Sequence, residues 1–166
     1  MRIEADGFEF DFTDAIDVFV FDERDKTEPM YHGLSHAMKA IDLIVELDAA
    51  YLFVEMKDFH SPEAYQENDH FNRLRETLKG KFRDSWLYRW AENKVDKPIH
   101  YLCLLTLENA LVLRMNKEMR KQLPPGRPVS RWQRAIADAC VVLNVERWNS
   151  KFSAWPVSRI GAGGPP

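Results

Sequence analysis

Residues 40–59 read AIDLIVELDAAYLFVEMKDF, two β-prone apolar runs separated by a short polar turn. In the first run Ile41, Leu43 and Ile44 place apolar side chains at both even and odd positions, the pattern of a strand covered on both faces. An unpaired charge buried in such a strand costs several kcal/mol. The stretch therefore predicts a buried β-hairpin in which Asp42 and Glu55 have compensating partners.

The parity of this hairpin decides which side chains meet. With the tip at residues 49–50, Asp42 lies opposite Lys57, and Ile44 lies opposite Glu55. Side chains alternate along a strand, and opposed or diagonal neighbours lie within about 8 Å. Asp42, Glu55 and Lys57 are therefore expected to converge on one face, whereas a turn of the other parity would move Asp42 to the opposite face.

Two carboxylates beside one ammonium form a suitable pocket for a hard divalent cation. Mg²⁺ is commonly held by one or two carboxylates, waters and substrate phosphate. Such a cation lowers the pKa of its bound water and neutralises charge that develops on phosphoryl oxygens. A fixed lysine adds a compact positive charge beside them.

Asp42, a spacer of twelve residues, and Glu55-Met56-Lys57 on an apolar strand resemble the Asp…Glu-x-Lys signature of the PD-(D/E)XK nuclease superfamily. The resemblance implies an α/β (α+β) fold with a mixed central sheet flanked by helices, the restriction-endonuclease-like αβββαβ core. It also implies Mg²⁺- or Mn²⁺-dependent phosphodiester hydrolysis in nucleic acid. Asp42 and Glu55 would be metal ligands, the Met56 carbonyl a further ligand, and Lys57 the residue that orients the attacking water. One departure is Ile41, at a position where the family often has proline.

Other interpretations of these residues stay open. Glu-x-Lys is common in proteins, so Lys57 and one of the acids could form a structural ion pair, although the apolar strand around them favours a metal site. The resemblance also suggests that an acid at the end of the first predicted helix, Asp22 or Glu23, joins the metals. His32 and His36 fit a core or surface role better than a zinc site.

The periodicity of apolar residues predicts the scaffold around the hairpin. Strands are expected at 7–12, 31–37, 40–47, 51–59, 100–107 and 140–143, and helices at 14–23, 61–93, 109–123, from 130 onward and in a closing turn that Asn144 caps. These elements are expected to form one nuclease-like domain over residues 1–160. The composition of residues 161–166 predicts a disordered tail.

Length and composition exclude several classes of protein. A chain of 166 residues with 45% apolar residues can bury an ample core. It contains no apolar run long enough to span a membrane and no signal peptide at its start, so a cytoplasmic protein without a membrane partner is expected. Cys103 and Cys140 lie in apolar stretches, which indicates reduced core cysteines.

The charge is distributed unevenly along the chain. The net charge is −3, and residues 1–30 hold ten acids against three bases. Basic residues cluster in 73–94 and 114–134, where they could follow a phosphate backbone or could simply be solvated helix faces.

Two functions from different classes are consistent with these observations. The first is a metal-dependent nuclease that acts on DNA or RNA, with DNA the expected partner. The second is a catalytically silent protein of the same fold that binds a protein or nucleic-acid partner. The intact Asp42, Glu55 and Lys57 favour the first. The modest net charge favours the second, or a nuclease that depends on a protein partner or a second copy of the chain for targeting.

Overall fold

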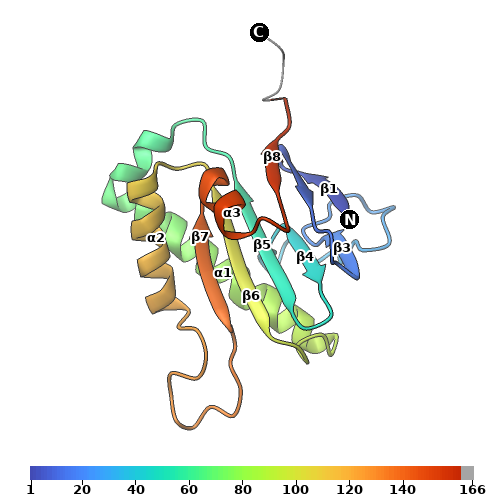
Figure 1. Ribbon diagram of the computed structural model, residues 1–166. Helices are drawn as coiled ribbons and strands as arrows, with labels where there is room; N and C mark the ends of the chain where they lie inside the picture. The colour runs from blue at the N-terminus through green and yellow to red at the C-terminus, as the bar shows by residue number, and fades with distance from the viewer. Residues whose placement is uncertain (162–166) are drawn as a thin grey trace.

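The strand-forming runs pair into two sheets in the computed structural model, which describes residues 1–161 (Figure 1). The larger sheet has the order β3 (Asp17–Val20), β4 (Leu43–Glu46), β5 (Tyr51–Lys57), β6 (Ile99–Leu105) and β7 (Ala139–Leu143). Its first three strands form an antiparallel meander, and β6 and β7 continue it in parallel. The smaller, antiparallel sheet contains β1 (Arg2–Ala5), β2 (Phe8–Asp11) and β8 (Val157–Arg159). The fold is therefore mixed α/β, as the sequence predicts.

Helices and the small sheet cover the two faces of the large sheet (Figure 1). A 3-10 turn, η1 (Pro62–Gln66), leads into α1 (Asn68–Ala91), which connects the parallel strands β5 and β6. Parallel neighbours require a crossover of this kind. The helix α2 (Asn109–Gln122) lies beside α1, and α3 (Val145–Lys151) packs with the small sheet on the opposite face.

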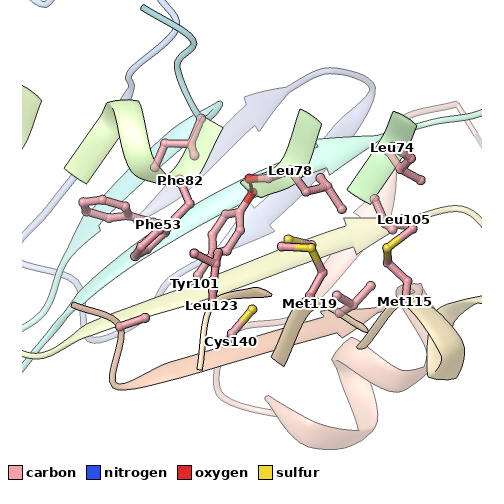
Figure 2. Packing of buried hydrophobic residues seen from close by; sticks show 14 of the residues in the cluster. Phe53, Leu74, Leu78, Phe82, Tyr101, Leu105, Met115, Met119, Leu123 and Cys140 are labelled. Carbon is pink, nitrogen blue, oxygen red and sulfur yellow. Dashed lines mark hydrogen bonds between the residues drawn. The ribbon is translucent and has the colours of Figure 1, made fainter. Parts of the chain in front are cut away.

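Alternation along the central strands sends side chains into two separate cores. Phe53 and Tyr101 pack with Leu78 and Phe82 of α1 in the core beneath the helices, which Figure 2 shows from close by. The intervening residues of β5 and β6 enter a second core, where three phenylalanines of residues 8–12 pack with the fully buried Trp148. Both faces of β5 therefore pack against apolar side chains, which explains its near-continuous hydrophobic sequence.

Three predicted elements are wrong. Residues 14–23 do not form a helix, because Val18, Phe19 and Val20 are β-prone and pair with β4 instead. The segment 31–37 contains no strand, so β3 takes the place it was expected to fill in the meander. No helix begins at residue 130, where the chain forms turns before β7.

Most of the other predicted elements are confirmed with small shifts of their ends. The 40–59 hairpin is β4 and β5, the strand at 100–107 is β6, and the helix at 109–123 is α2. The long helix starts later than expected, at Asn68, because η1 occupies its predicted first turns. The tail predicted for 161–166 lies outside the described residues apart from Gly161.

Of the helices in the part of the chain that the structure describes, none combines the length and the apolar composition that a bilayer span requires. The longest, α1, carries charged residues along much of its exposed surface.

The packing of α1 on the sheet predicts a large loss of stability for Phe82→Ala. The Phe82 ring is fully buried, 5.8 Å from Phe53 and 5.0 Å from Tyr101 between ring centroids. We expect the free energy of unfolding in urea to fall by about 3–5 kcal/mol. The matched control Leu87→Ala, on the exposed side of α1, should change it by less than about 0.5 kcal/mol. Equal losses in the two variants would contradict this packing.

Candidate functional site

The turn of the central hairpin comes one residue earlier than predicted, and this changes the pairing without changing the face. Leu43 pairs with Val54 and Ile44 with Phe53, so the predicted pairs Asp42–Lys57 and Ile44–Glu55 are wrong. The register moves by two residues, which preserves parity. Asp42 comes directly before β4, and its backbone N–H donates to the Val54 carbonyl at 3.1 Å. Continuing the register places Asp42 opposite Glu55 on the face beneath α1.

A lysine of α1 bridges the two carboxylates. The Lys81 Nζ lies 3.2 Å from the Asp42 Oδ1 and 2.8 Å from both oxygens of Glu55. The Glu55 side chain is fully buried, and Asp42 is only 7% exposed. The Asp42 Oδ2 also accepts a 2.6 Å hydrogen bond from the Met56 backbone N–H, which fixes this carboxylate against β5. The result is a buried cluster of two acids and one base, here called the Asp42–Lys81–Glu55 cluster.

The cluster holds one negative charge more than it can neutralise when all three groups are ionised. Burial raises the pKa of the Glu55 carboxyl well above its usual range, and the Asp42 charge raises it further, whereas the Lys81 ammonium lowers it. Burial likewise raises the pKa of Asp42 against the opposing effect of Lys81. The pKa of Lys81 is raised, because attraction to the two carboxylates outweighs the effect of its burial. A proton or an additional cation would each relieve the excess charge.

Lys57 lies at the mouth of a cleft beside this cluster. The cleft has a volume of about 420 Å³, and Asp42, Met56, Lys57 and Lys81 line it. Lys57 is partly exposed, and within residues 1–161 its ammonium makes no salt bridge within 4.0 Å. The structure thus brings all three predicted residues to one region, with Lys81 rather than Lys57 paired to the carboxylates.

The rim of the cleft is acidic. Glu4 and Asp6 come from β1 and the turn that follows it, and Asp22, Glu23 and Arg24 come from the segment after β3. Asp22 and Glu23 therefore line the cleft as suggested, although they lie on a loop rather than at the end of a helix. Asp22 pairs with Arg24 at 3.4 Å, which partly neutralises this side of the rim.

The donor set fits a hard cation in chemistry but lacks a third side-chain ligand. Over residues 1–161, no three His, Cys, Asp or Glu side chains converge as a metal-binding group. Mg²⁺ needs only one or two carboxylates when waters and phosphate complete its shell. The ammonium of Lys81 already lies between Asp42 and Glu55, which shows that this space accommodates a cation. A metal at these carboxylates would have to displace that ammonium.

The two histidines lie away from the cluster. His32 packs between Phe21 and Tyr88, at 5.4 Å and 5.1 Å between ring centroids, and its Nδ1 accepts a hydrogen bond from the Leu34 N–H. His36 is exposed. Their core and surface positions agree with the role that the sequence favoured.

Lys81 is the residue of the site that the sequence reasoning missed. Lys81 belongs to the cluster of basic residues in 73–94. It nevertheless follows Leu74 and Leu78 and precedes Ser85 at helical spacing, which places it on the buried face of α1. A lysine inside an apolar stripe needs a buried partner. That position was the signal that could have identified it.

Comparisons with known proteins give no relative. No protein-family model, no curated protein and no solved structure matches the chain. The geometry of the site therefore carries the functional argument.

The buried cluster predicts that Lys81→Met destabilises the protein in a pH-dependent way. Removing the ammonium leaves two carboxylates uncompensated, so we expect a loss of about 3–5 kcal/mol in the free energy of unfolding at about pH 8. A carboxyl whose pKa is raised in the folded state keeps its proton at pH values between its unfolded and folded pKa, where the unfolded chain has already released it. The free energy of unfolding therefore falls as the pH rises between these two pKa values. The loss should be smaller at about pH 5, where protons replace the missing charge.

Urea unfolding at both pH values measures this effect. Lys94→Met is the matched control, because Lys94 is exposed and lies 3.8 Å from Glu46 in a surface pair worth at most about 1 kcal/mol. A Lys81→Met loss that does not change with pH would contradict the excess charge.

Proposed function

We propose that this chain is a metal-dependent nuclease of the PD-(D/E)XK type, which hydrolyses phosphodiester bonds in nucleic acid, with DNA the expected substrate. The observation that carries the proposal is the pair of buried carboxylates, Asp42 and Glu55, that hold a cation between them beside an open cleft, which Asp42 and Lys81 line. Lys57 also lines that cleft, and its ammonium makes no salt bridge within residues 1–161.

The residues of the cleft suit the steps of such a hydrolysis. Asp42 and Glu55 would hold Mg²⁺ or Mn²⁺, which when bound lowers the pKa of a coordinated water and neutralises phosphoryl charge. Lys57 is free to donate hydrogen bonds to the attacking water and to a non-bridging phosphate oxygen. The Met56 N–H keeps Asp42 in one orientation, so little rearrangement of that carboxylate is needed. Lys81 must move from the carboxylates, and its released ammonium can then pair with phosphate.

The order of elements also supports this family. An antiparallel meander, a crossover helix and a parallel strand follow one another from β3 to β6. Asp42 comes directly before the second strand of the meander, and Glu55 lies in the third. The element before β3 departs from the restriction-endonuclease-like core, because the hairpin of β1 and β2 occurs there in place of a helix.

A second candidate is a catalytically silent protein of this fold. The position of Lys81 favours it, because an ammonium between two buried carboxylates can serve as a permanent structural cation. The acidic rim formed by Glu4, Asp6 and Glu23 would also oppose the approach of a polyanion in the absence of a metal. Such a protein would bind its partner elsewhere on the surface.

Substitution of the three predicted residues separates these functions. With Mg²⁺ or Mn²⁺ and labelled single- and double-stranded DNA and RNA, we expect Asp42→Asn, Glu55→Gln and Lys57→Ala each to reduce the cleavage rate by about a hundredfold or more. The control Asp48→Asn alters an exposed carboxylate at the turn of the same hairpin and should cleave at the wild-type rate. If no substrate is cleaved with either metal, or if the variants keep full activity, the nuclease proposal is wrong.

Metal affinity should depend on pH because the same carboxylates bind protons. We expect the affinity for Mn²⁺, measured by titration calorimetry, to rise with pH by up to about tenfold per unit for each proton displaced. Glu55→Gln should remove most of this dependence, since the pKa of Glu55 is raised most clearly by burial. Lys81→Met should bind Mn²⁺ more tightly than wild type because the competing ammonium is gone. A wild-type affinity for Mn²⁺ that stays constant from about pH 4 to about pH 8 would contradict proton displacement from these carboxylates.

A further inference from the structure

A second cavity adjoins the cleft on the side of α1. It has a volume of about 200 Å³ and is formed by the end of β5, by η1 and by the first half of α1. Its lining residues are Lys57, Tyr65, His70, Arg73, Leu74 and Thr77. Lys57 lines both the cleft and this cavity, so one ammonium is shared by the two openings.

The two openings differ sharply in charge. The far rim of the cleft carries four carboxylates and Arg24, whereas the second cavity is lined by Arg73, Lys57 and His70 and by no acid. The exposed Glu67 lies beside this cavity, and its Oε2 is 3.7 Å from the His70 Nε2. A polyanionic strand that passes the cluster is thus repelled by the rim and attracted toward the second cavity.

The groups of this cavity are available and held in place. Arg73 is exposed and, within residues 1–161, forms no salt bridge within 4.0 Å. Tyr65 packs against Phe59 with ring centroids 4.4 Å apart, and the His70 ring approaches Tyr65 at 6.1 Å. The aromatic wall is therefore fixed by neighbouring rings, while within residues 1–161 the Arg73 guanidinium and the Lys57 ammonium make no salt bridge that an anion would have to displace.

We infer that this cavity is a subsite for the phosphodiester group next to the scissile one, in which Arg73 is the principal phosphate ligand. The inference rests on the proposed nuclease function, because it assigns the path of the substrate strand away from Asp42 and Glu55. Arginine suits this role, since its planar donors bind phosphate oxygens in pairs. The volume suits one phosphate with its sugar, so a single strand, rather than a base pair, would occupy the cavity.

The test is binding of a short fluorescein-labelled single-stranded oligonucleotide, measured by fluorescence anisotropy in Ca²⁺, a weaker Lewis acid than Mg²⁺. We expect Arg73→Ala to weaken binding by about tenfold and to lower the slope of log affinity against log salt by about one. The control Arg83→Ala removes another exposed arginine of α1, which lies outside both cavities, and should weaken binding less than about twofold.

A methylphosphonate scan of the oligonucleotide locates the contact. Neutralising the phosphate next to the cleaved bond should weaken binding to wild type by about tenfold and leave binding to Arg73→Ala unchanged. Equal effects of Arg73→Ala and Arg83→Ala, a scan with no sensitive position, or no binding at all would overturn the subsite.

The outcomes separate this inference from the proposed function. Cleavage by wild type together with equal binding by the two arginine variants would overturn the subsite alone. Absence of cleavage together with binding that depends on Arg73 would overturn the nuclease proposal, and with it the assignment of a scissile bond, and would leave Arg73 as a phosphate contact of a non-catalytic binding protein.

Discussion

Two buried carboxylates that share one ammonium are the constraint on which the rest of this structure depends. Glu55 lies in β5 and Asp42 lies just before β4, two strands that are apolar on both faces, and Lys81 reaches both acids from the helix that covers one of those faces. Removing water strengthens the attraction among these groups and makes their excess charge costly. The fold therefore has to keep the Lys81 ammonium beside Asp42 and Glu55 for both carboxylates to stay buried.

The fold supplies both the burial and the access that such a site needs. Glu55 lies in β5, the middle strand of the five-stranded sheet, with β4 and β6 on either side. Asp42 comes just before β4, where the sheet begins and the cleft opens. The Glu55 carboxylate is fully buried, whereas the Asp42 carboxylate lines the cleft, so the cleft reaches the pair at Asp42.

The sequence alone predicts the hairpin and the face on which its acids lie, but it does not predict the elements that pack around them. Parity alone places Asp42 and Glu55 on one face. The turn lies one residue earlier than expected, which shifts the strand pairing by two residues and therefore leaves both side chains on the predicted face. The helix expected at 14–23 is absent because Val18, Phe19 and Val20 have high β-propensity and pair with β4. Lys81 could not be paired with the acids from local pattern, because the contact depends on how α1 crosses the sheet.

The central position of β5 protects the Asp42–Lys81–Glu55 cluster against local unfolding. Strands with hydrogen-bonded neighbours on both sides exchange their amide hydrogens last, usually only when the whole domain opens. Fraying of β3 or β7 at the sheet edges would leave the Glu55 backbone protected. The Asp42–Lys81–Glu55 cluster should thus persist through partial denaturation or limited proteolysis of peripheral loops. It should be lost only when the whole sheet unfolds cooperatively.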